Sequence, residues 1–225
     1  MFGKEKILVL LAMLPAFGFA SEVLVSDTLF VAFDTETTGF SAKDDRLVEV
    51  GAVKFRGDGE VMATTNWLVN PERPIPWYTT DVHHITDEMV AEAPVFAEIW
   101  PDIEAFFGDA VLLAHNANFD VGFLKAELER TEVEMPALPM ADTLTLFRNW
   151  FPRSKSHELE ALSVELHVSG EMYHRAEADA FYIVDIFKVG MKHRLMMTMN
   201  RFELDAGGFN WLGEKKPNAD DYFQR

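Results

Sequence analysis

The chain has 225 residues, of which 48 % are hydrophobic and 25 % are charged, and this ordinary composition excludes global disorder. Its formal net charge of −17 excludes binding to a nucleic acid through overall attraction, so any such binding has to come from a local site or from bridging cations. The chain has no cysteine, which excludes a disulfide framework, a cysteine zinc site and a thiol nucleophile.

The first twenty residues have the pattern of a secretory signal peptide. Two lysines near the start are followed by a mostly apolar run at residues 7–20, and Gly18 and Ala20 are small residues suited to a cleavage site. The apolar run is too short to span a bilayer as a helix. We therefore expect residues 1–20 to direct export to the periplasm or the medium. The alternative is a packed N-terminal helix or a misassigned start codon, which would leave the protein in the cytoplasm.

Three strands are expected next. Residues 29–33 are a continuous apolar run, typical of a strand that is buried on both faces. Residues 46–56 are rich in valine, and Asp58-Gly59 is a hairpin turn signal that leads into a strand at 61–69. The sequence thus predicts three antiparallel strands, followed by an extended loop at 70–77 that contains three prolines.

Helices and one further strand are expected in the remainder of the chain. Thr86 is suited to be the N-cap of a short helix, and apolar side chains recur at helical spacing in residues 94–107. A short buried strand is expected at 111–114. Later helices are expected at 117–129, 142–150, 158–167 and 176–195, with Gly170 ending the third of them.

Asp34 and Glu36 follow directly on the first apolar strand. They are two residues apart, so both side chains point to the same face. Two carboxylates at one strand end repel each other and lose hydration unless a cation lies between them, and hard oxygen ligands suit Mg²⁺ or Mn²⁺. The alternative, for an isolated pair, is a solvated strand end followed by a loop.

Three further residues extend this pair into a site. Asp120 lies in the first turn of an expected helix, where the helix dipole favours its charge. His174 stands five residues before Asp179, so the histidine can reach over a site that Asp179 faces from within a helix. Carboxylates from three segments match two-metal phosphodiester hydrolysis, with His174 as the base that takes a proton from water. Taken singly, Asp120 could be a first-turn helix charge and His174 a capping residue.

Eight segments together carry a resemblance to a known family. They are FVAFDTETTGF (30–40), RLVEVGAVKF (46–55), NPERPIPW (70–77), HHIT (83–86), LLAHNANFDVGFL (112–124), ADTLTLFR (141–148), SHELEALSVEL (156–166) and HRAEADA (174–180). On these segments the sequence resembles the DEDDh branch of the DnaQ-like 3′–5′ exonucleases. It is especially similar to the proofreading subunit of bacterial DNA polymerase III and its free-standing relatives. The segments occur in family order and cover about residues 28–190, so their joint signal is specific although each alone is weak.

The resemblance implies an α/β, ribonuclease H-like fold with a five-stranded mixed sheet flanked by helices. It also implies release of nucleoside 5′-monophosphates from the 3′ ends of single-stranded DNA or RNA, or of frayed ends, with two Mg²⁺ or Mn²⁺ ions per site. We accordingly divide the chain into a signal peptide at 1–20, an exonuclease domain at 28–196 and an irregular tail at 197–225. By position, the metal-binding carboxylates are Asp34, Glu36, Asp120 and Asp179, and the general base is His174.

The resemblance extends to residues around the carboxylates. His83 matches a family histidine in the proline-rich loop, but His84 stands where relatives usually carry glycine, which leaves the backbone geometry of that loop open. The residues expected to line the pocket for the terminal nucleotide are Thr37, Phe40, His115 and Asn116.

One basic cluster stands out in this acidic chain. It consists of Arg148, Arg153, Lys155 and His157. Its position next to the expected active-site helices favours a phosphate contact for the incoming strand, through Arg153 and Lys155 in particular. The alternative is a solvated, charged loop.

The expected function is thus an exported, metal-dependent 3′–5′ exonuclease. The first alternative is a cytoplasmic proofreading or repair exonuclease, although the stretch after residue 195 has no evident polymerase-docking motif. An alternative of another class is a nucleic-acid-binding protein that has lost catalysis. The presence of all five expected catalytic side chains argues against that alternative.

Overall fold

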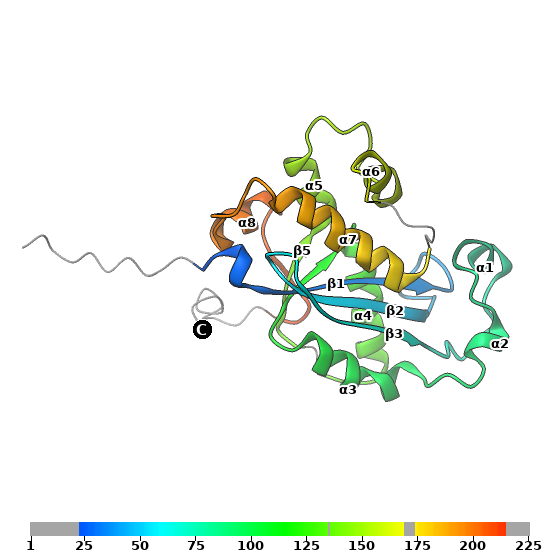
Figure 1. Ribbon diagram of the computed structural model, residues 1–225. Helices are drawn as coiled ribbons and strands as arrows, with labels where there is room; N and C mark the ends of the chain where they lie inside the picture. Colours follow the sequence, from blue (N-terminus) through cyan, green and yellow to red (C-terminus); the bar gives the residue numbers. More distant parts are fainter. Residues whose placement is uncertain (1–22, 135, 169–173, 215–225) are drawn as a thin grey trace, which may run out of the picture.

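The computed structural model describes residues 23–134, 136–168 and 174–214. Its centre is a six-stranded mixed sheet in the order β3-β2-β1-β4-β5-β6, with helices against both faces (Figure 1). The strands are β1 (Leu29–Thr37), β2 (Leu47–Arg56), β3 (Val61–Leu68), β4 (Val111–Ala114), β5 (Pro139–Asp142) and β6 (Asn210–Trp211).

β1 lies in the middle of the sheet. It pairs antiparallel with β2 and parallel with β4, while β2 pairs antiparallel with β3. This confirms the predicted opening of three antiparallel strands. In the register of β1 and β2, Asp34 lies opposite Gly51 and Glu36 lies opposite Glu49. The ends of both strands are therefore held together at the position of the predicted site.

Each face of the sheet has its own apolar core. Phe33 points to the face covered by α3 (Phe96–Phe107) and α4 (Asn118–Arg130), and its ring packs against Phe107. Phe30 points to the face covered by α5 (Thr143–Trp150), α7 (Ala176–Met191) and α8 (Met199–Asp205), and its ring packs against Phe187. Alternate residues of β1 thus serve opposite cores, as the period of a strand requires.

The predicted sheet was wrong by one strand. The sixth strand, β6, comes from residues expected to be an irregular tail, and the helix α8 comes from the same stretch. A two-residue strand is too short to show any hydrophobic alternation, so only its pairing with Pro139 and Met140 of β5 reveals it. α8 is begun by Thr198, whose side-chain oxygen accepts a hydrogen bond from the backbone N–H of Arg201.

Most predicted helices are present. The helices of the structure not yet named are α1 (Trp77–His83), α2 (Asp87–Val90) and α6 (Leu159–Glu165). α1 was not expected, because three prolines precede it, yet Pro76 takes its N-cap position with extended backbone angles. Thr86 is the N-cap residue of α2 as predicted, although its side chain makes no capping hydrogen bond. The expected end of a helix at Gly170 and the signal peptide at 1–20 lie outside the described residues.

α7 ends four residues earlier than its apolar pattern predicted. The guanidinium of Arg194 donates a hydrogen bond to the carbonyl of Gly190 and lies 4.9 Å from the centre of the Trp150 ring. In a continuing helix that carbonyl would accept the backbone N–H of residue 194, so the side chain replaces the next backbone bond. The helix therefore ends at Met191.

The backbone conformation at His84, left open by the sequence, is the one in which glycine is common. It has the left-handed backbone angles φ 60° and ψ 16° and closes the C-terminus of α1, where its N–H bonds the carbonyl of Thr80. Glycine adopts this conformation at no steric cost, which explains why it is the usual residue at such a position. His84 thus has the backbone conformation that glycine adopts most easily.

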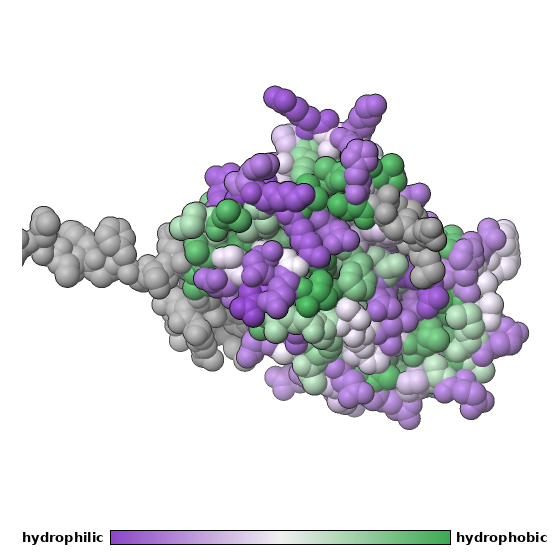
Figure 2. Space-filling view, in the orientation of Figure 1, coloured by the Kyte–Doolittle hydropathy of each residue, from purple (hydrophilic) through white to green (hydrophobic). Residues whose placement is uncertain are grey.

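On the surface shown in Figure 2, hydrophilic and hydrophobic residues are interspersed over the helices. Within the described ranges, every helix is too short or too polar to cross a membrane.

Candidate active site

Three carboxylates meet at the end of β1, against the first turns of α7. One carboxylate oxygen from each of Asp34, Glu36 and Asp179 lies within 4.8 Å of the other two, and all three side chains are partly buried. Asp34 and Glu36 share one face of β1, and α7 packs across β1 and β2. The structure thus brings these predicted residues together. Their role as metal ligands stays a prediction.

Asp120 approaches the same strand from α4. Its side chain is 2 % exposed, and its Oδ1 accepts a 2.7 Å hydrogen bond from the hydroxyl of Thr35. Thr35 lies between the two β1 carboxylates but points to the other face of the sheet. Asp120 is outside the group of three oxygens, yet its charge contributes to raising the pKa of Asp34, so it belongs to the same electrostatic site.

The carboxylates of β1 are held where a negative charge is unfavourable. Burial, and after it the charges of Asp120, Glu36 and Asp179, hold the pKa of Asp34 well above its usual value. Burial, and after it the charge of Asp179, raises the pKa of Glu36 to about 8. A divalent cation bound among these crowded carboxylates would favour their charged forms.

Asp179 and Asp120, the two carboxylates that come from helices, have neighbours that lower their pKa values, whereas burial raises them. Burial raises the pKa of Asp179 to about 6, against the lowering influence of His174. Burial also raises the pKa of Asp120 to about 7, against the lowering influence of the hydrogen bond from Thr35. Burial is therefore the main cause of the raised pKa values of all four predicted acidic residues.

The raised pKa values predict that the stability of the metal-free protein depends on pH. In the folded state the pKa of Glu36 is about 8, whereas in the unfolded chain it is near 4.5, so the folded protein keeps a proton that the unfolded chain has lost. The free energy of unfolding should therefore fall as the pH rises from about 4.5 to about 8. Relative to Glu36→Gln, wild type should lose about 2–4 kcal/mol between pH 5 and pH 8.5, measured by urea unfolding in EDTA.

Glu104, exposed on α3, provides the matched control for this experiment. Its change to Gln should leave the pH dependence of wild type unaltered. Addition of Mg²⁺ at pH 8.5 should stabilise wild type more than Glu36→Gln, because the cation relieves the repulsion. If the free energies of unfolding of wild type and Glu36→Gln differed by a constant amount over this pH range, the raised pKa of Glu36 would be contradicted.

His174 lies beside the carboxylates through its backbone. Its N–H donates a 3.1 Å hydrogen bond to Oδ2 of Asp179, and its side chain is exposed to solvent. Its φ of 59° is in the left-handed region, which is uncommon outside glycine and is often found at functional sites. The structure thus places His174 next to Asp179. Its role as the base stays a prediction.

The residues expected to line a nucleotide pocket differ in how available they are. Phe40 is 85 % exposed, and Asn116 is exposed with a φ of 62°. Thr37 is buried and its hydroxyl donates to the carbonyl of Gly39. His115 has Thr143 and the carbonyl of residue 157 as partners of its two ring nitrogens. The side chains of Phe40 and Asn116 are thus exposed to a ligand, whereas those of Thr37 and His115 are bonded within the protein.

The expected phosphate-binding residues lie on the segment between α5 and α6. Arg153 and Lys155 are exposed there, and the carbonyl of His157 on the same segment accepts the hydrogen bond from His115. His115 immediately follows β4, whose end leads into α4 and Asp120. The basic segment is therefore linked to the end of β4 through a partly buried hydrogen bond, while a contact with substrate stays a prediction.

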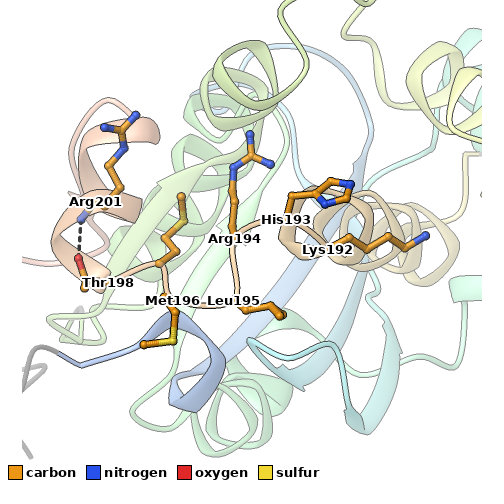
Figure 3. Close-up of a pocket in the computed structure, with 8 residues that line it drawn as sticks. Lys192, His193, Arg194, Leu195, Met196, Thr198 and Arg201 are labelled. Carbon is orange, nitrogen blue, oxygen red and sulfur yellow. Dashed lines mark hydrogen bonds between the residues drawn. The ribbon is translucent and has the colours of Figure 1, made fainter.

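A separate basic hollow lies at the other end of α7. It has a volume of about 550 Å³ and is lined by Lys192, Arg194, Leu195 and Arg201, among others (Figure 3). Asp179 is in the first turn of α7 and the hollow follows its last residue, so about 18 Å of helix separates them at 1.5 Å per residue. The hollow is not part of the carboxylate site.

Two residues of the site were missed in the sequence. Glu49 is fully buried in β2 opposite Glu36, and Thr35 orients Asp120. A single glutamate within the apolar run of β2 was a usable signal, because a buried carboxylate requires a partner. Thr35 gave no signal, since its partner is 85 residues away.

Known proteins are similar to this chain in sequence. Residues 31–187 match the protein family described as "Exonuclease". The DNA polymerase III subunit epsilon of Treponema pallidum is 39 % identical over 166 residues, which cover 73 % of this chain and 77 % of that protein. A DNA polymerase III of the PolC type from Latilactobacillus sakei is 42 % identical over 192 residues, but the match spans only 13 % of its length.

Solved structures share the fold. Exonuclease X in complex with 5′ overhanging duplex DNA aligns with a TM-score of 0.62 at 24 % identity, over 78 % of this chain and 99 % of that one. Exonuclease I of E. coli in complex with a dT13 oligonucleotide aligns with a TM-score of 0.67 at 18 % identity, over 75 % of this chain and 42 % of that one.

Proposed function

This chain belongs to the DnaQ-like family of 3′–5′ exonucleases, and on that premise we propose that it degrades single-stranded DNA or RNA from the 3′ end with two divalent metal ions. The products would be nucleoside 5′-monophosphates. The ions would be Mg²⁺ or Mn²⁺, held by Asp34, Glu36, Asp120 and Asp179.

The observation that carries this proposal is the crowding of carboxylates at the end of β1. Oxygens of Asp34, Glu36 and Asp179 lie within 4.8 Å of one another, and the pKa of each of these groups is raised. Carboxylate oxygens are the ligands that Mg²⁺ and Mn²⁺ prefer. The residues present therefore fit the metals that the family implies.

The side chains of the site would then share the chemistry. Bound divalent ions supply an activated water and stabilisation of the leaving oxygen. His174, exposed beside Asp179, would accept the proton from the attacking water at a ring nitrogen. Asp179 would hold the backbone of His174 through the bond it accepts from that residue. Phe40, largely exposed, would offer its ring face to the terminal base.

A product and substrate profile tests the proposal. The purified protein would be incubated with 5′-labelled single-stranded DNA, single-stranded RNA and blunt duplex, each with Mg²⁺, Mn²⁺ or EDTA. We expect a ladder of products shortened from the 3′ end, release of nucleoside 5′-monophosphates, and no cleavage in EDTA. Internal cuts, or cleavage that persists in EDTA, would refute the proposal.

Arg153 and Lys155 would contact phosphates of the strand upstream of the cut. Their joint change to Ala should raise the KM for single-stranded DNA and flatten its dependence on salt, because fewer counterions are released on binding. The steady-state KM at two salt concentrations measures this. A double change of Lys192 and Arg201 to Ala, which removes the same charge at the far end of α7, should leave KM unchanged. An unchanged KM in the first variant would remove Arg153 and Lys155 from the substrate path.

We further propose that the enzyme is exported. The support is the charged start and the apolar run of residues 1–20, which lie outside the described part of the chain. Sequencing of the protein from a secreted or periplasmic fraction should find a mature N-terminus at Ser21. Recovery of the full chain from the cytoplasm alone would favour the cytoplasmic alternative.

A further inference from the structure

Glu49 is a buried carboxylate next to the proposed metal site. It is fully buried in β2, and in the strand register it lies directly opposite Glu36. Removing a carboxylate from water is costly unless its charge and its hydrogen-bonding oxygens are satisfied. The partners of Glu49 therefore show what this residue does.

Those partners come from two sides of the site. Asn66 of β3 donates to Oε1 at 2.9 Å. Arg175 reaches both oxygens, with its Nε 3.1 Å from Oε2 and its Nη2 bonded to Oε1. The backbone N–H of Ala176 donates to Oε2 at 3.0 Å. Burial alone would raise the pKa of Glu49, but these bonds outweigh it and lower that pKa.

These bonds exclude Glu49 as a further metal ligand. Each of its oxygens accepts from Arg175, and each has a second donor, Asn66 for Oε1 and Ala176 for Oε2. A carboxylate that is saturated by donors has no free lone pair directed at the cluster. Glu49 thus differs from Asp34 and Glu36, whose pKa values are raised, whereas the pKa of Glu49 is lowered.

The two residues that Glu49 binds, Arg175 and Ala176, lie in the chain between His174 and Asp179. His174 immediately precedes Arg175, and Asp179 follows Ala176 by less than one helical turn. The backbone of Asp179 also bonds the carbonyl of Arg175, and its carboxylate bonds the N–H of His174. Fixing residues 175 and 176 therefore fixes the positions of His174 and Asp179.

Gly51 allows this contact to be close. A Cβ atom at Gly51 would lie 2.0 Å from the backbone nitrogen of Glu177 and 2.2 Å from the carbonyl carbon of Ala176, so any side chain there would push α7 off the sheet. Gly51 is the register partner of Asp34. The backbone of α7 thus meets β2 directly beside the carboxylates, and Glu49 binds it there.

We propose that Glu49 is a positioning residue: through Arg175 and the first N–H of α7 it sets Asp179 against Asp34 and Glu36 and holds His174 beside them. This inference rests on the proposed function of the site. Glu49 touches neither metal nor substrate, and it acts on catalysis only through the segment that it binds.

The test is Glu49→Gln, which keeps the size of the side chain but places an amide N–H₂ against donors. Mn²⁺ affinity should fall about 10- to 100-fold when measured by electron paramagnetic resonance, a readout that is independent of catalysis. The kcat at saturating Mn²⁺ should fall by a similar factor, whereas KM for an oligonucleotide should stay near the wild-type value. Arg175→Lys, which keeps the charge and loses the two-nitrogen contact, should give an intermediate loss and serves if Glu49→Gln does not fold.

Glu127 offers a matched control. It is also a buried glutamate, 1 % exposed, and its Oε1 accepts from Arg46 and from the backbone N–H of Leu47 at the start of β2. Glu127→Gln should lower the melting temperature without changing Mn²⁺ affinity.

The outcomes separate the inference from the function on which it rests. Wild-type Mn²⁺ affinity and kcat in folded Glu49→Gln or Arg175→Lys would overturn the inference. An equal loss in Glu127→Gln would overturn it as well, because it would reduce Glu49 to general stability. A wild-type protein that neither binds Mn²⁺ nor cleaves would refute the proposed function, and the inference with it.

Discussion

Asp34→Asn is expected to lose at least about 10²–10³-fold in nuclease activity, the scale of removing one electrostatic stabiliser of a transition state. It should also make the metal-free protein more stable. Asp34 lies within the crowded carboxylates, and its pKa is held well above its usual value by burial and by neighbouring charges. An amide keeps the shape of the side chain and removes one of the repelling charges. Single-turnover cleavage and urea unfolding at pH 8 in EDTA measure the two effects.

A carboxylate elsewhere in the fold should show the opposite pattern. Asp205 is 9 % exposed, accepts a hydrogen bond from the indole N–H of Trp150 and pairs with Arg201 at 2.7 Å. Asp205→Asn should therefore lower stability and leave cleavage near the wild-type rate. An Asp34→Asn protein that cleaved normally, or that lost stability as Asp205→Asn does, would show that Asp34 is a structural residue.

The His174→Ala protein should retain its fold and metal binding but lose about 10²-fold or more in its cleavage rate, the range expected for loss of general-base catalysis. Only the side chain is removed, so the N–H bond of residue 174 to Asp179 can remain. The rate would be measured at saturating Mg²⁺ under single-turnover conditions, with circular dichroism to verify the fold.

His193→Ala is the control for this loss. His193 is an exposed histidine at the opposite end of α7, in the wall of the basic hollow (Figure 3). Its removal should not change the rate. Full activity in His174→Ala would refute the role of His174 as the base, whatever the control shows.

Features set by local periodicity were predictable from the sequence. The apolar run of β1, the hairpin at Asp58-Gly59 and the helical spacing of α3 each appear where expected. The short strand β4 was also expected and is present at 111–114, but the two other short strands were not predictable. β5 has four residues and β6 has two, and each is a strand only because a neighbouring strand pairs with it. α1 follows a proline-rich stretch that shows no helical spacing.

The four carboxylates of the site were predictable from the sequence, but the residues that bond to the site and position it were not. Asp34 and Glu36 share a face because they are two residues apart on a strand, which a sequence shows directly. The bond from Thr35 to Asp120 and the ion pair of Glu49 with Arg175 depend on how α4 and α7 pack on the sheet. No local pattern contains that packing, so both contacts had to come from the structure.

The pairing of Glu49 with Arg175 also determines when the site is completed during synthesis. The two residues are 126 positions apart, so β1 and β2 leave the ribosome long before the segment that they hold. Until residues 174–179 emerge, the chain has Asp34, Glu36 and Asp120, but it lacks the histidine proposed as the base and the third carboxylate of the group formed with Asp34 and Glu36. On the proposed function, the metal site would be complete only after α7 has docked on β1 and β2.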